Sequence, residues 1–237
     1  MEQRYSGEEK IGHIVSEFPG ASNLFKELKI DFCCGGNRSL GDAIRQRKLD
    51  EGDVLRRLNK SFAEWKQKEA HDQTDWRVAP ISELIDHIIH VHHAYLRVEL
   101  PLLSEFITKL LRVHGLTHGE LSTLHRQFHQ MKIELEQHLM IEEESLFPLM
   151  KEYATHPSRA LLERTLKGLR DVENDHSAVG DYLQEMRAAT EGYALPHDAC
   201  RTYTITFHKL VELESDLFQH IHLENNILFP RIEEQAV

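Results

Sequence analysis

Two copies of one pattern place a histidine and a glutamate four residues apart. The pattern H-x3-E-x3-L-F-P begins at His138 and again at His220, so the paired acids are Glu142 and Glu224. On an α-helix, residues four apart lie on the same face, one turn from each other. Each copy therefore directs an imidazole and a carboxylate toward one point. Together these groups are ligands for iron, manganese or zinc.

The segments that precede the two copies have the spacing of bundle helices. Mostly apolar residues alternate at intervals of four and three, and the two His-Glu pairs continue the same stripes. Charged groups are rarely buried unless they are paired or bind a metal. The pattern therefore predicts a metal site inside a helix bundle. The stripe positions are Leu124, Phe128, Met131 and Leu135 before the first copy, and Thr206, Leu210, Leu213 and Leu217 before the second.

Two further histidines extend the repeat. His93 precedes His138 by 45 residues, and His176 precedes His220 by 44 residues. Each lies on the apolar stripe of another predicted helix. His92 is an alternative to His93, and the repeat offsets favour His93. Six ligands exceed what one tetrahedral zinc takes, and they fit two metal ions that share carboxylates. The predicted set is His93, His138, Glu142, His176, His220 and Glu224.

Four long helices are predicted to position these side chains, at about 80–114, 117–153, 157–190 and 196–234. Proline begins three of them, and Thr117 with Glu120 forms a capping-box pattern at the other. Short connections make neighbouring helices antiparallel. We expect an all-α fold, an up-down-up-down four-helix bundle preceded by a small helical domain. The predicted divisions are residues 1–70 for the small domain, 71–79 for a linker and 80–237 for the bundle.

The small domain contains two adjacent cysteines, Cys33 and Cys34, followed by Gly35 and Gly36. We expect a turn there, with glycines that can take positive φ. Adjacent cysteines close a disulfide only with strain, which favours a role as thiols. The alternative is a pair of inert thiols. The third cysteine, Cys200, completes no disulfide framework.

Composition excludes several classes of function. The net charge is −11, with the acidic excess after residue 70, which argues against a nucleic-acid partner. The sequence has no run of 18 apolar residues, so we expect no membrane span. The first ten residues have no apolar signal core, and a cytoplasmic protein is expected. The sequence leaves dimerisation open.

Taken together, these motifs resemble the repair-of-iron-centres family of the YtfE/ScdA type. Residues 80–234 are similar to a hemerythrin-like domain, and the segment from Asp31 to Gly36 is similar to the family's N-terminal cysteine pair. The resemblance implies two non-haem iron ions, held by the four histidines and bridged by the two glutamates. It also implies a thiol role for Cys33 and Cys34.

The function that this resemblance implies is the repair of iron-sulfur clusters damaged by nitric oxide or peroxide. Labile iron from the di-iron centre would be supplied to iron-sulfur client proteins, with nitric oxide or dioxygen as small ligands. The electron donor is not indicated. The same bundle could instead serve as a nitric oxide reductase, as an oxygen or redox sensor, or as a ferroxidase or peroxidase. The cysteine segment argues against the sensor.

Overall fold

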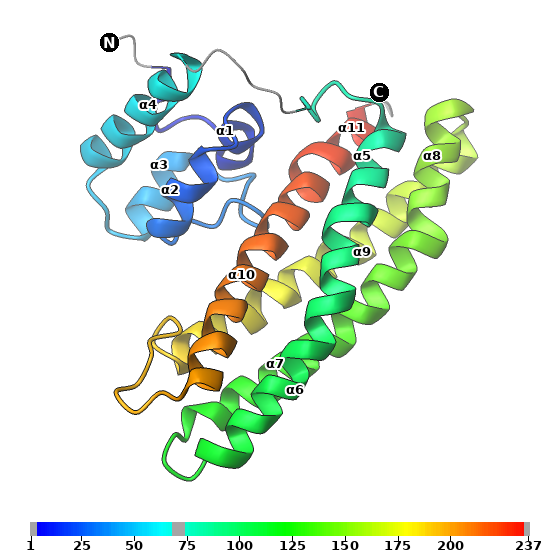
Figure 1. Cartoon of the computed structure of the whole chain (residues 1–237). Coiled ribbons are helices and arrows are strands. Elements are labelled where there is room, and N and C mark those ends of the chain that lie inside the picture. Colours follow the sequence, from blue (N-terminus) through cyan, green and yellow to red (C-terminus); the bar gives the residue numbers. More distant parts are fainter. Residues whose placement is uncertain (1–3, 68–73, 235–237) are drawn as a thin grey trace. The chain divides into compact units, whose positions relative to one another are not determined.

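The computed structural model describes residues 4–67 and 74–234, and all their regular elements are helices (Figure 1). The all-α fold class is therefore confirmed. The chain divides into two compact units. One unit contains the residues up to Pro80 together with those from Ile221 onward, and the other runs from Ile81 to His220. The predicted division at residues 71–79 stays a prediction, and residues 71–73 of that linker lie outside the described residues.

Short helices form the N-terminal part of the first unit. Side chains cap two of them. The Ser39 side chain accepts a hydrogen bond from the backbone N–H of Asp42, and the Asp50 carboxylate accepts one from the N–H of Asp53. These contacts satisfy donors that helix starts leave open. The helices are α1 (Ile11–Glu17), α2 (Ala21–Glu27), α3 (Leu40–Gln46) and α4 (Glu51–Gln67).

The same unit contains the C-terminal end of the chain. There η3 (Glu224–Leu228) and α11 (Phe229–Glu233) continue the last long helix. Arg231 of α11 donates hydrogen bonds to the backbone carbonyls of Trp76 and Ala79. The core of this unit is formed by large buried side chains, among them Tyr5, Ile11, Ile14, Phe25, Phe32, Leu40 and Ile44.

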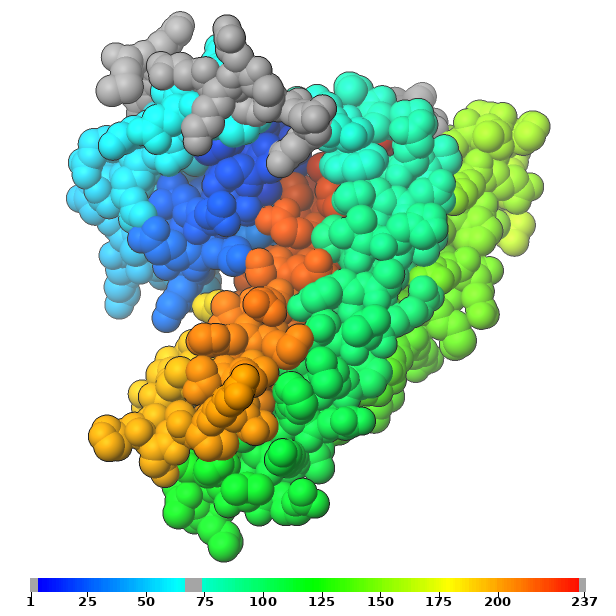
Figure 2. Space-filling model, viewed as in Figure 1, coloured from blue at the N-terminus to red at the C-terminus, as the bar shows by residue number. Residues whose placement is uncertain are grey.

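Long antiparallel helices form the second unit (Figure 1). Buried leucines and phenylalanines recur along them at the spacings that the sequence predicts. Figure 2 shows the side chains of α6 meeting those of α10 along a continuous boundary, where Lys209 and Glu99 form an ion pair of 2.7 Å. The elements are α5 (Ile81–His87), η1 (Ile88–His93), α6 (Ala94–His114), α7 (Glu120–Ile141), η2 (Glu142–Leu146), α8 (Phe147–Thr155), α9 (Arg159–Ala189) and α10 (Arg201–Leu223).

Two predicted helix starts are wrong. The hydroxyl of Thr117 donates to the carbonyl of His114 and so closes the preceding helix, whereas α7 begins after Gly119 without a side-chain cap. The last long helix begins at Arg201 and not at Pro196, because the carbonyl of Pro196 accepts a turn hydrogen bond from Ala199. Both signals belong to turns, which use the same residue types as helix starts.

Positive φ is not found at Gly35 or Gly36. Of the described residues, those with positive φ are Lys29, Lys48, Glu191, Gly192 and Tyr193. The two glycines after the cysteines therefore serve another purpose, which is close approach of neighbouring atoms. In the described part of the chain, no helix combines the length and the apolar character that crossing a membrane requires.

The cap of α3 gives a test of the first unit. We expect Ser39→Ala to lower its free energy of unfolding by about 1 kcal/mol, because the N–H of Asp42 loses its acceptor. Ser61→Ala, in the middle of α4, is the matched control and should change stability by less than about 0.5 kcal/mol. Trp65 and Trp76, the two tryptophans of the chain, lie in this unit. Their fluorescence during urea unfolding would measure both changes, and equal midpoints for the two variants would contradict the cap.

Candidate metal centre

Four buried histidines from four helical runs form two pairs. The Nε2 atoms of His93 and His220 are 3.1 Å apart, and those of His138 and His176 are also 3.1 Å apart. All four side chains are at most 2% exposed. Each pair therefore offers two imidazole nitrogens to a common point in the interior of the bundle.

The separation within each pair is short enough for both nitrogens to bind one ion. With metal–nitrogen bonds of about 2.1 Å, adjacent ligands of an octahedron lie roughly 3.0 Å apart, and those of a tetrahedron roughly 3.4 Å apart. The observed 3.1 Å lies between these two values. Imidazole with carboxylate oxygen, and without thiolate, is a donor set that suits iron, manganese or zinc.

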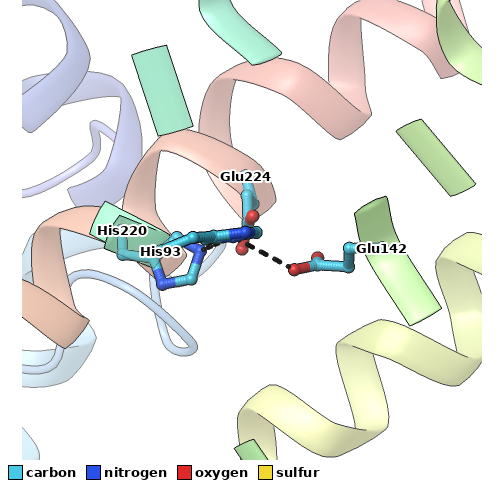
Figure 3. Close-up of side chains that lie close together, drawn as sticks. All are labelled: His93, Glu142, His220 and Glu224. Carbon is cyan, nitrogen blue, oxygen red and sulfur yellow. Dashed lines mark hydrogen bonds and ion pairs between the residues drawn. The ribbon is translucent and has the colours of Figure 1, made fainter. Parts of the chain in front are cut away.

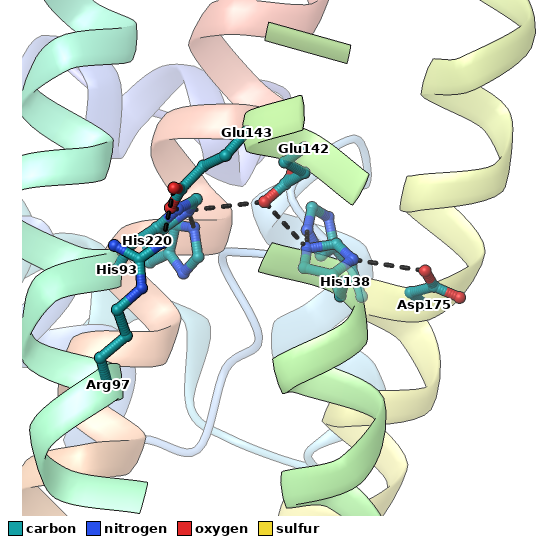
Figure 4. Close-up of polar contacts among 8 residues, drawn as sticks. His93, Arg97, His138, Glu142, Glu143, Asp175 and His220 are labelled. Atoms are coloured by element: carbon teal, nitrogen blue, oxygen red, sulfur yellow. Dashed lines mark hydrogen bonds and ion pairs between the residues drawn. The ribbon is translucent and has the colours of Figure 1, made fainter. Parts of the chain in front are cut away.

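Glu142 lies between the two histidine pairs. Its Oε2 atom is 3.4 Å from Nε2 of His93 and 3.3 Å from Nε2 of His138 (Figure 4). The side chain is fully buried. One carboxylate thus contacts a histidine of each pair.

Glu224 is also fully buried. It follows His220 by one turn, because α10 continues without interruption into η3. The buried histidines and glutamates form two overlapping groups of four residues. Within each group, all four ligand atoms lie within 4.8 Å of one another. One group, drawn in Figure 3, is His93, Glu142, His220 and Glu224, and the other is His138, Glu142, His176 and Glu224. Both glutamates belong to both groups, while each histidine belongs to one.

Wider helical turns occur beside both glutamates. Glu142 begins the π-helical segment η2, and Glu224 begins η3. The N–H of Phe147 bonds to the carbonyl of Glu142, five residues back, and the N–H of Phe229 does the same with Glu224. Proline follows each phenylalanine, and it lacks an N–H and would clash with the carbonyl four residues back. Such π-helical insertions are frequent at functional sites.

Comparison with known proteins places this geometry in a family. Residues 84–232 match the family model of the hemerythrin HHE cation binding domain, and residues 7–61 match ScdA_N, described as a domain of unknown function. The chain is 30% identical over 226 residues to the iron-sulfur cluster repair protein ScdA of Staphylococcus haemolyticus, covering 94% of this chain and 97% of that protein. It is 33% identical over 224 residues to the iron-sulfur cluster repair protein YtfE of Escherichia coli O81, covering 94% and 96%.

The chain belongs to the ScdA/YtfE family of iron-sulfur cluster repair proteins. Its bundle is a cation-binding domain of the hemerythrin HHE type. The buried histidines and glutamates described above lie within the matched residues.

In this family member, outer carboxylates fix the orientation of two of the histidines. Nδ1 of His93 is 2.7 Å from the carboxylate of Glu143, which also pairs with Arg97 (Figure 4). Nδ1 of His138 is 3.3 Å from the carboxylate of half-exposed Asp175. These contacts leave each Nε2 directed inward, as metal-bound histidines require. Sequence analysis missed these partners, because no periodic pattern distinguishes them from surface acids.

The same contacts determine the charge of Glu143. Partial burial alone would raise its pKa, but hydrogen bonds from Arg97 and His93 outweigh burial, and the pKa of Glu143 is lowered from its ordinary value. By contrast, burial is the main cause that raises the pKa of Asp175. Glu143 is therefore the more firmly ionised of the two outer partners.

His92 occupies a different position from His93. Its Nδ1 is 2.9 Å from the carboxylate of Asp216, and its ring stacks on that of His220 at 5.6 Å between centroids. The ring of His92 packs against the face of the His220 ring. By contrast, Nε2 of His93 approaches Nε2 of His220. The geometry therefore favours His93 as the candidate ligand.

Cys33 and Cys34 lie in the turn after α2, in the first unit. Both are free thiols, and their sulfur atoms are 3.7 Å apart. The pKa of Cys33 is well above its usual value because of its hydrogen bond with Cys34, its burial and the nearby Asp31 carboxylate. A raised pKa keeps the sulfur protonated at neutral pH, so Cys33 is not an activated nucleophile.

The outer partner of His93 can be tested directly. We expect Glu143→Gln to lower metal affinity by about 10-fold to 100-fold, because the His93 ring loses a charged acceptor. Glu144→Gln is the matched control, since Glu144 is exposed beside it. Competition with a calibrated chelator would measure both affinities. Equal affinities for the two variants would show that Glu143 does not orient a ligand.

Proposed function

We propose that this chain repairs damaged iron-sulfur clusters, and that a di-iron centre in its bundle supplies the iron. The observation that carries the proposal is the pair of overlapping ligand groups that share both glutamates. Two relatives that match over nearly their whole length are named iron-sulfur cluster repair proteins. Damaged iron-sulfur proteins would be the clients, and iron would be the cargo.

In this proposal, each iron is held by one histidine pair, and both are bridged by the two glutamates. His93 and His220 would hold one ion, and His138 and His176 the other, with Glu142 and Glu224 as bridges. Two carboxylates oppose the charge of two divalent ions, and four neutral imidazoles add no charge. When bound, ferrous iron would offer open coordination positions and reversible one-electron chemistry.

The contacts around the histidines support release of iron from the site as well as its binding. The two Nε2 atoms of each pair lie within hydrogen-bonding distance, at 3.1 Å. Hydrogen bonding between the ligands would therefore compensate in part for the loss of an ion. Buried polar groups without such partners would cost several kcal/mol each. The outer partner of His138, Asp175, has half of its side chain exposed, so this end of the ligand chain is close to solvent.

Transfer of labelled iron tests the function. The full chain, loaded anaerobically with iron-57, would be mixed with a client enzyme whose cluster has been destroyed by nitric oxide. We expect client activity to return and the label to appear in the client's restored cluster by Mössbauer spectroscopy.

Free ferrous iron at the same concentration is the control for that experiment. Restored activity without label in the client would contradict iron donation. Production of nitrous oxide without any return of client activity would instead support the hypothesis that the bundle is a nitric oxide reductase.

The shared position of Glu142 gives a second test. Glu142→Ala should reduce bound iron from about two ions per chain to below one, because a bridging ligand serves both ions. His176→Ala should weaken the binding of one iron ion more than the binding of the other. The control Glu144→Ala should load normally, since that side chain is exposed. Iron content by mass spectrometry would measure all three, and normal loading of Glu142→Ala would reject the bridging assignment.

A further inference from the structure

The turn that carries the two cysteines brings three possible metal ligands together. The Sγ atoms of Cys33 and Cys34 are 3.7 Å apart, and Sγ of Cys33 is 3.3 Å from Oδ1 of Asp31. The ligand atoms of these three residues all lie within 4.8 Å of one another. All three belong to the first unit, and none of them is among the candidate ligands of the bundle.

The distances match the edges of a tetrahedron around one ion. Metal–sulfur bonds of about 2.3 Å and metal–oxygen bonds of about 2.0 Å at tetrahedral angles separate two sulfurs by roughly 3.8 Å. They separate sulfur from oxygen by roughly 3.5 Å. The observed 3.7 Å and 3.3 Å are close to both.

We propose that Asp31, Cys33 and Cys34 form a second metal site, which binds one divalent cation with affinity for thiolate. Three protein ligands leave the fourth tetrahedral position open. Two sulfurs and one carboxylate select zinc-like or ferrous ions over magnesium or calcium, which take oxygen ligands.

Hydrogen bonds hold the ligands in this arrangement. Oδ1 of Asp31 accepts the backbone N–H groups of Cys33 at 3.0 Å and Cys34 at 3.1 Å. Asn226 of η3 donates through Nδ2 to the carbonyls of Phe32 at 3.2 Å and Cys33 at 3.0 Å. The backbone around the cysteines is therefore fixed from two sides, and little conformational entropy remains to be lost when an ion binds.

Glycines make room for the residue that holds the turn. A Cβ atom on Gly12 would come 2.1 Å from Oδ1 of Asn226, and one on Gly36 would come 2.2 Å from the same atom. A Cβ atom on Gly35 would lie 2.9 Å from Oδ2 of Asp31. The glycines of the cysteine segment are thus required for close packing of the groups that position the ligands.

Access to the three ligands is unequal. Cys33 is only 4% exposed, whereas Cys34 and Asp31 are partly exposed. A bound ion would contact buried Cys33 on its inner side, and solvent could approach it beside Cys34 and Asp31. A thiolate of another protein could take the open fourth position, and ligand exchange would then move a ferrous ion without changing its oxidation state. This transit role rests on the proposed function, whereas the metal site itself does not.

Anaerobic titration with cobalt(II) tests the site. The probe is added to the full chain after its bundle has been loaded with iron. We expect one cobalt per chain, with a thiolate-to-cobalt charge-transfer band and the intense visible bands of a tetrahedral ion. The candidate ligands of the bundle include no sulfur and cannot produce the charge-transfer band. Its absence from the wild-type chain would overturn the proposal.

Variants identify the ligands. Cys33→Ser and Cys34→Ser should each weaken the charge-transfer band and lower cobalt affinity by at least about 10-fold. Asp31→Asn keeps an acceptor for the two backbone N–H groups, and it should lower affinity while the turn stays folded. Cys200→Ser is the matched control, because that exposed cysteine lies outside the cluster. An unchanged band in either of the Cys33 and Cys34 variants would reject that ligand.

The transit role has a separate readout. In the iron-57 transfer experiment, the double variant Cys33→Ser with Cys34→Ser should keep its bundle iron and transfer it to the client at least about 10-fold more slowly. Transfer at the wild-type rate would overturn the transit role. If the wild-type chain itself transfers no label, the proposed function fails, and the cobalt result still decides whether the second site exists.

Discussion

The burial of two carboxylates between two histidine pairs is the constraint on which the bundle depends. Moving an ionised carboxylate into a protein interior costs several kcal/mol unless other charges and hydrogen bonds compensate. Glu142 and Glu224 are both fully buried. The surrounding imidazoles, and the outer acids that orient two of them, provide the partners. The histidines and Glu142 lie on helices of the second unit, and Glu224 follows His220 on the same continuous helical run.

The prolines of the repeated pattern are part of that constraint. Proline at 148 and 230 cannot donate a backbone hydrogen bond, and the helix accommodates each one with a wider turn. Both wider turns begin at a shared glutamate. In each copy the proline lies six residues after the glutamate whose carbonyl accepts the wider hydrogen bond.

Much of this arrangement follows from periodicity alone. The four buried histidines and two buried glutamates are predictable because the same offset recurs at every position of two hairpins. Glu143 and Asp175 are not predictable in this way, because an outer partner needs only to reach one ring nitrogen. The start at Arg201 was missed because proline is suited equally to a turn and to a helix. The sequence predicts backbone freedom at Gly35 and Gly36, but Gly36 makes room for Asn226, which is 190 residues away in the sequence, and Gly35 makes room for Arg38 and Asp31.

The pairing of Asn226 with the cysteine turn has a consequence for biosynthesis. Its hydrogen bonds join residues separated by 194 and 193 positions. A ribosome releases the N-terminal residues long before it reaches the last helix, and domains otherwise tend to fold as they emerge. The first unit cannot complete its packing until residue 226 has been made. Until then, Asp31 holds the backbone N–H groups of Cys33 and Cys34, while the carbonyls of Phe32 and Cys33 still lack their donor from Asn226.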